Sequence, residues 1–152
     1  MLSKFLNNDS LTMFLFHGVV EKCEYRVRNY NRKHIELQYF EQLMHGVSNR
    51  GAALSLEEVV DHHVRGKRFP AKSFAVTFDD GFENNYSVAA PVLEKLHVPA
   101  AFYVTSAFIE HNGMSWIDRI ECCMERAEPK SLLLPWESVP RVFGNMTDEV
   151  AA

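Results

Sequence analysis

The residues best suited to chemistry in this sequence are two adjacent aspartates, Asp79 and Asp80, followed directly by Gly81. Two ionised carboxylates held side by side repel each other, and a divalent cation relieves that repulsion. Consecutive residues that leave a strand point in different directions, so one carboxylate can bind a cation while the other faces a water molecule as general base. This combination is typical of metal-assisted hydrolysis. Gly81 lets the backbone turn sharply and lets a substrate approach closely.

The same three residues are also compatible with a simple tight turn. Asp-Gly is a strong hairpin signal, and a solvated acidic pair is the usual meaning of an isolated Asp-Asp-Gly. The residues after Gly81 do not alternate as a returning strand would, because apolar residues over 88–96 recur with a helical period. An antiparallel hairpin over residues 74–88 would contradict the hydrolytic interpretation.

We call Asp79, Asp80 and Gly81 the acidic turn. Three apolar segments are expected to form a parallel sheet that carries this turn at its edge. Residues 74–78, rich in β-branched and aromatic side chains, are the clearest strand. Residues 11–16 are apolar on both faces and predict a buried strand, and residues 100–105 predict another. The helical segment over 88–96 joins two of these strands. Because Pro91 lies within it, the helix is expected to begin late or to kink at that residue. Strand, helix and strand in this order form a βαβ unit and hence a parallel sheet.

Polar side chains follow each of these strands. His17 comes after the first strand, Asp79 and Asp80 come after the second, and Thr105 and Ser106 come after the third. Because ligands bind beyond the carboxyl ends of parallel strands, we expect these groups to open onto one face. A lone histidine is otherwise more often a satisfied core or surface residue.

Two further helices are expected before the acidic turn. Apolar residues recur at steps of three and four over residues 37–47, which marks one face of a helix. Ser55 and Glu58 form a capping box that begins a short helix. We interpret His62 and His63 as the exposed end of that helix, where a cationic side chain is favourable, and not as metal ligands. Residues 110–152 predict only a weakly defined region of helix and loop.

Composition excludes several classes of function. The chain has 152 residues, 47% of them hydrophobic and 24% charged, as in an ordinary globular domain. Its net charge of −4 lacks the basic footprint of a nucleic-acid-binding protein. No segment approaches the roughly 20 apolar residues of a membrane span, and no leader peptide is apparent, so we expect a cytoplasmic protein. The cysteines Cys23, Cys122 and Cys123 lack metal-site spacing and are expected to be reduced thiols.

Several segments match the motifs of a known family. They are Phe14–Val19 (FLFHGV), Phe74–Gly81 (FAVTFDDG), Asn84–Tyr86 (NNY), Ala90–Leu93 (APVL) and Val98–Val104 (VPAAFYV). Together they resemble the first motif and first strand of the polysaccharide deacetylases, the NodB-homology proteins of carbohydrate esterase family 4. The resemblance spans roughly residues 11–109.

The resemblance implies a fold, an activity and a set of site residues. The family fold is a distorted (β/α) barrel with fewer than eight complete units. Its members are hydrolases of non-peptide C–N bonds that remove acetyl groups from poly- or oligosaccharides, with zinc or a similar divalent cation. On this resemblance Asp79 is the catalytic base and Asp80 is a metal ligand. His17 and Gly81 would contact the substrate.

The sequence lacks several hallmarks of that family, including its later Arg-x-Pro-x motif and its C-terminal catalytic histidine. The family completes its metal site with two histidines in an H-x3-H motif, but no two of the seven histidines here are four residues apart. We therefore interpret residues 1–152 as the N-terminal portion of such a domain, an α/β partial barrel that ends before this motif. Half a barrel leaves strand edges and apolar surface open, so self-association is expected. A non-catalytic remnant or carbohydrate-binding half-domain, and a Mg²⁺-dependent phosphate-handling α/β protein, remain alternative functions.

Overall fold

The structure is a computed structural model that describes residues 5–25, 27–126, 130–133, 135–136 and 138–143. The chain forms two compact units. The first unit contains residues 1–23 and 32–106, and the second contains residues 24–31 and 107–152. Each unit is described by itself.

A four-stranded parallel sheet forms the centre of the first unit. Its strands are β1 (Thr12–Phe16), β4 (Ala52–Ala53), β5 (Ser73–Phe78) and β6 (Ala100–Phe102). β1 pairs with β5 along its whole length, while β4 pairs with the start of β5 and β6 with its end. Among the described residues β5 has only parallel partners, and a helical turn follows Gly81, so the hairpin alternative is wrong. The described strands form an open sheet and not a closed barrel.

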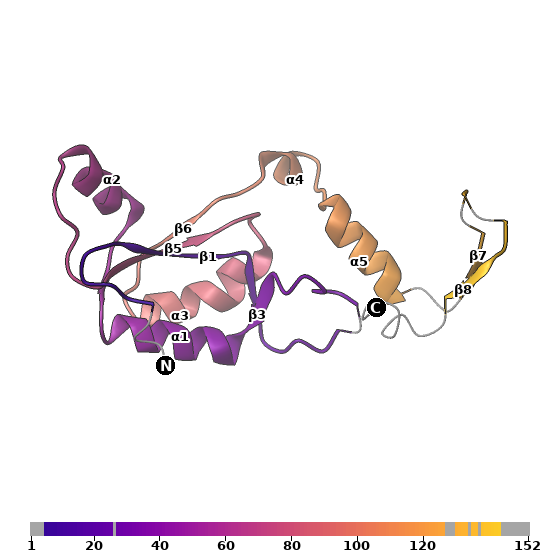
Figure 1. The fold of residues 1–152 in the computed structure, drawn as a ribbon, viewed down its shortest axis with the longest axis horizontal. Helices are drawn as coiled ribbons and strands as arrows, with labels where there is room; N and C mark the ends of the chain where they lie inside the picture. Colours follow the sequence, from indigo (N-terminus) through magenta and orange to yellow (C-terminus); the bar gives the residue numbers. More distant parts are fainter. Residues whose placement is uncertain (1–4, 26, 127–129, 134, 137, 144–152) are drawn as a thin grey trace. The chain divides into compact units, whose positions relative to one another are not determined.

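The core lies on one face of this sheet, beneath α1 (Leu37–Ser48) and α3 (Ala90–Lys95) (Figure 1). All six residues of β5 are buried, as its apolar sequence predicts. Phe40 and Met44 of α1 are fully buried against it, as the helical period predicts. Full burial of such a side chain is worth about 1.5–3 kcal/mol, so this contact stabilises the unit.

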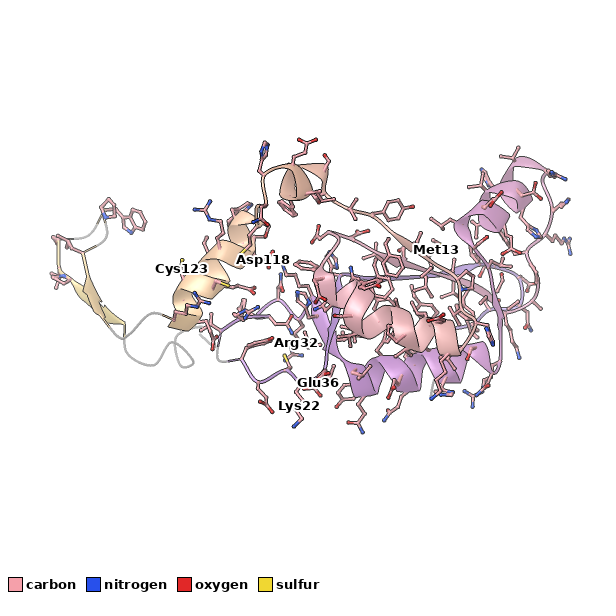
Figure 2. The ribbon with its side chains drawn as sticks, turned by 180° about the vertical axis from the view of Figure 1, so that it is seen from behind. Met13, Lys22, Arg32, Glu36, Asp118 and Cys123 are labelled. Atoms are coloured by element: carbon pink, nitrogen blue, oxygen red, sulfur yellow. The ribbon has the colours of Figure 1, made fainter. Side chains whose placement is uncertain are left out.

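The opposite face of β1 is open, which corrects the expectation of a strand buried on both faces. Phe14 and Phe16 pack against the core, whereas Met13 and Leu15 are 48% and 57% exposed. Figure 2 shows Met13 on the side of the sheet away from α1. Side chains of a strand alternate between faces, and only one face of β1 has a helical layer over it.

The chain between Gly81 and α3 forms a π-helical turn, η2 (Asn85–Ala89). Pro91 has no backbone N–H, so it cannot supply the usual partner for the carbonyl of Ser87 four residues earlier. The backbone widens instead, and the N–H of Ala90 bonds to the carbonyl of Asn85. The expected helix therefore begins earlier than its apolar pattern indicates.

Two very short strands were not predicted from the sequence. β2 (Gly18–Val20) and β3 (His34–Glu36) form a separate parallel pair in which Gly18 lies opposite His34. A side chain at residue 18 would collide with the His34 ring, because a Cβ there would lie 2.2 Å from Nδ1. This close approach explains the glycine.

The capping box at Ser55 and Glu58 is confirmed, with both of its hydrogen bonds present. It begins α2 (Leu56–Val64), which places His62 and His63 in the last turn, as expected. His62 Nδ1 lies 3.0 Å from the carbonyl oxygen of Arg68, so this ring has a structural partner.

The second unit contains most of α4 (Ser106–Glu110), then α5 (Trp116–Arg126) and an antiparallel pair, β7 (Lys130–Leu132) with β8 (Arg141–Phe143). Residues 144–152, part of the weakly defined region, lie outside the described residues. None of the described helices is long and apolar enough to cross a membrane.

Acidic side chains of α5 hold residues 27–29 in the second unit. The Glu125 carboxylate accepts hydrogen bonds from two consecutive backbone N–H groups, those of Val27 and Arg28. The Glu121 carboxylate, one helical turn earlier, accepts from the N–H of Asn29. Ser115 caps the start of α5 by accepting from the N–H of Asp118.

Candidate functional site

The backbone ladder of the sheet continues one residue beyond β5 and thereby fixes the position of Asp79. The Asp79 N–H donates to the carbonyl of Phe16 at 2.9 Å, and the Tyr103 N–H donates to the carbonyl of Phe78 at 2.8 Å. His17, Asp79 and Tyr103 therefore occupy equivalent positions at the ends of three neighbouring parallel strands. We call these three residues the strand-end row.

The side chains of the strand-end row leave the backbone on the face of the sheet away from α1 and α3. The rings of Phe16 and Phe102 pack on that of Phe78, with centroids 5.4 and 5.0 Å apart, and Phe16 also packs on Phe40 of α1. These rings therefore lie on the helical side. The next residue of each strand points to the opposite side. Alternation thus brings the side chains of the row to a common side.

Asp80 and Gly81 turn the chain away from the sheet in two successive left-handed conformations, with φ of 69° and 68°. This geometry is uncommon for an aspartate. The Asp80 side chain therefore points in a different direction from the Asp79 side chain, whose direction is still set by the strand. A Cβ at residue 81 would lie 2.8 Å from Cγ1 of Val104, so the turn also requires a glycine for space.

Side chains from β3 and from Lys33, the residue directly before it, contact side chains just after the acidic turn. The Phe82 ring lies edge-on to the His34 ring, with centroids 4.6 Å apart, and Nζ of Lys33 lies 4.9 Å from the centre of the Phe82 ring. Nδ2 of Asn84 lies 3.2 Å from Nδ1 of His34, and it donates to that nitrogen when the imidazole is neutral. His34 was not predicted from the sequence, because a three-residue strand gives no periodic signal.

The structure brings together some of the predicted site residues. His17 and Asp79 are neighbours in the strand-end row, and both are half-buried. Asp80 is half-buried and Gly81 is exposed in the turn that follows. Thr105 and Ser106 are not at the end of the third strand, because β6 ends at Phe102. Tyr103 takes that place. Its apolar neighbours led to the prediction of a longer strand.

The residues present do not form a complete metal site. Within the part of the chain that the structure describes, no three His, Cys, Asp or Glu side chains are grouped so that they could hold a metal ion. Catalytic zinc sites normally use three protein ligands. The acidic turn can supply carboxylate oxygen atoms to a cation but does not enclose one.

Comparisons with known proteins agree with this geometry. The family described as Polysaccharide deacetylase matches residues 66–148, which is more than half of the chain. Among curated proteins, no sequence matched. The match includes the acidic turn, η2, α3 and β6.

Three solved structures share the fold. IcaB from Ammonifex degensii is 28% identical, with a TM-score of 0.53, over 65% of this chain and 40% of that one. The Streptococcus pyogenes deacetylase PplD, solved in complex with acetate, is 20% identical, with a TM-score of 0.57, over 79% of this chain and 53% of that one. A de-N-acetylase from Aggregatibacter actinomycetemcomitans is 22% identical, with a TM-score of 0.57, over 66% and 39% of the two chains.

The chain thus spans about half or less of the length of these structures. Their likeness to it confirms a partial NodB-like α/β fold with parallel strands, as the resemblance implied. Together with the match over residues 66–148, the fold and the acidic turn establish that this chain belongs to the polysaccharide deacetylase family.

Proposed function

We propose that this chain provides the acidic half of the active site of a metal-dependent hydrolase that removes acetyl groups from a carbohydrate. The observation that carries the proposal is the position of Asp79 in the strand-end row, with Asp80 turned away directly after it. Two adjacent carboxylates with different directions can take different roles. Membership of the polysaccharide deacetylase family supports an acetylated poly- or oligosaccharide as the substrate.

Asp79 is the general base in this proposal. Its carboxylate takes a proton from a water molecule as the water oxygen attacks the acetyl carbonyl carbon. The bond from that carbon to the sugar nitrogen or oxygen then breaks. The proton passes to the leaving atom, and acetate and the free amine or hydroxyl are released. His17, the neighbour of Asp79 in the strand-end row, and exposed Gly81 border the place where the acetyl group would lie.

Asp80 is proposed as one ligand of a divalent cation, with zinc as the expected ion. Such a cation would polarise the acetyl carbonyl and acidify the attacking water. The described residues do not provide a full set of ligands, so the other ligands would come from outside them. The chain alone is then expected to bind zinc weakly.

Zinc titration with matched variants tests the two roles. Asp80→Asn should abolish the weak binding of zinc measured by calorimetry, whereas Asp79→Asn should retain it. Glu57→Gln is the control, because it neutralises an exposed carboxylate on α2 outside the acidic turn. In a protein that carries this chain together with a complete set of metal ligands, both aspartate variants should lose the release of acetate from N-acetylglucosamine oligomers.

Two results would contradict the proposal. Equal zinc binding by the parent chain and Asp80→Asn would show that Asp80 is not a zinc ligand. Undiminished acetate release by Asp79→Asn would show that Asp79 is not the general base. Binding of acetylated oligomers without any acetate release would support a carbohydrate-binding half-domain instead.

A further inference from the structure

Tyr103 combines a fixed backbone with an exposed ring. Its N–H is bonded to the carbonyl of Phe78 at 2.8 Å, so the residue is held beside the end of the buried strand β5. Its side chain is nevertheless 53% exposed. A rigid aromatic ring with a polar tip is well suited to ligand contact, because little conformational entropy is lost when it binds.

The neighbours of Tyr103 have clear packing roles. The Phe102 ring stacks on Phe78, with centroids 5.0 Å apart and planes 19° from parallel. The side chain of Val104 borders Gly81, where it leaves no room for a Cβ. Side chains of a strand alternate between its two faces, so the Tyr103 side chain leaves the backbone on the face opposite that of Phe102. The Asp79 side chain leaves on the same face as that of Tyr103.

The spacing of the strand-end row matches the size of a sugar. Neighbouring strands lie roughly 4.8 Å apart, so Tyr103 is about one strand spacing from Asp79, which is close to the width of a pyranose ring. His17 lies on the other side of Asp79 and is polar. A sugar with its acetyl group at Asp79 therefore finds the exposed phenol ring of Tyr103 on the β6 side.

We propose that Tyr103 is a substrate-contact residue that stacks on the apolar face of the acetylated hexopyranose and donates its hydroxyl to a sugar oxygen. This inference rests on the proposed function, because it takes an acetylated sugar as the ligand and Asp79 as the group beside its acetyl carbon. Tyr103 therefore selects for sugars over acetylated molecules that lack a ring.

Fluorine NMR on the 152-residue chain tests this role directly. The chain has five tyrosines, so incorporation of 3-fluorotyrosine gives five signals, and Tyr103→Phe identifies one of them. Titration with the N-acetylglucosamine tetramer should shift that signal. Tyr103→Ala should weaken the measured affinity about two- to tenfold, and Tyr103→Phe should retain most of it.

Tyr86→Ala is the matched control, because Tyr86 is 83% exposed on η2 and lies outside the strand-end row. Its loss should leave the affinity unchanged. If the parent chain binds the tetramer but the Tyr103 signal does not move, or Tyr103→Ala binds equally well, this inference is wrong and the proposed function stands. If the parent chain binds no acetylated oligosaccharide, both the inference and the proposed substrate class are wrong.

Discussion

At the scale of single residues, the acidic turn depends on two backbone conformations that most residues avoid. Asp80 and Gly81 are both left-handed, and an L-residue with a Cβ loses roughly 1–2 kcal/mol in this region. Strained conformations persist where the surrounding structure fixes them, and they occur most often at functional sites. Here the ladder bond of Asp79 on one side and the Phe82–His34 contact on the other fix the turn.

Gly81→Ala is expected to destabilise the protein by more than the backbone effect alone. The new Cβ would lie 2.8 Å from Cγ1 of Val104, in addition to the unfavourable φ of 68°. Gly66→Ala is the control, since Gly66 has a φ of 61° but no atom within 4 Å of the new Cβ. We expect roughly 1–2 kcal/mol for Gly66→Ala and a clearly larger loss for Gly81→Ala, measured by urea unfolding.

A second substitution separates the two causes of that loss. Val104→Ala in the Gly81→Ala background removes the colliding methyl groups and should recover part of the stability. Equal losses for the Gly81 and Gly66 variants would show that Val104 moves aside at no cost.

At the scale of elements, α2 depends on local interactions because none of its residues is buried. Its first turn is held by the capping box of Ser55 and Glu58. Near its end, the Arg65 guanidinium contacts the Asp61 carboxylate one turn earlier, an exposed pair of small value. We therefore expect α2 to open independently of the sheet.

The opening of α2 should depend on pH through Glu58. The hydrogen bond from the Ser55 backbone N–H, followed by that with its hydroxyl, lowers the pKa of Glu58 below its ordinary value of 4.5. The open helix then binds more protons than the folded one in the window just below pH 4.5. The stabilisation is present in full above that pH and is lost as the pH falls through the lowered pKa of the folded state. Hydrogen exchange of the α2 amides, measured from pH 3 to 6, should show this loss.

Two variants check the origin of the pH dependence. Glu58→Gln removes the titrating group, and its α2 protection should be independent of pH below 4.5. Ser55→Ala should cost about 1 kcal/mol of local stability at neutral pH. A pH dependence that survives in Glu58→Gln would assign the effect to another carboxylate.

The predictable elements are those with long, consistent patterns. α1 could be predicted from the helical period of its apolar residues, and β5 from its run of β-branched and aromatic residues. The capping box marks the start of α2 within four residues. β2, β3 and β4 have two or three residues each, which is too short for a period to appear. They form because tertiary contacts hold them in place.

The candidate site could be predicted where its signal is local. Asp79, Asp80 and Gly81 are adjacent in the sequence, and the segments on either side of them carry clear strand and helix patterns. His34 is 50 residues from Asn84, its partner, and only the folded chain brings them together. The strand-end position of Tyr103 depends on register, which the apolar run of residues 100–105 does not specify.

At the scale of the whole molecule, the open face of β1 is the feature most relevant to association. Met13 and Leu15 are exposed on a strand at the edge of the described sheet. Exposed apolar side chains on an edge strand favour contact with another chain. Self-association of the chain stays a prediction, and the exposed face of β1 is the surface at which we expect it.

Leu15→Lys should reduce that self-association. A charge on this face costs little in the monomer, because Leu15 is 57% exposed, but it would be buried in a contact between two copies. Sedimentation velocity over a range of concentrations should show less association than in the parent chain. Val60→Lys, a similar change at an exposed position on α2, is the control. Equal effects of the two changes would indicate a general effect of charge.

The pairing of β1 with β5 also has a consequence during synthesis on the ribosome. Thr12 is opposite Phe74, so β1 has no strand partner until the ribosome has added about 60 more residues. At typical translation rates of about 5–20 residues per second, this delay lasts roughly 3–12 seconds. For that time the apolar segment of β1 is available to chaperones. Slower decoding between these two strands would lengthen the exposure and lower the yield of folded protein.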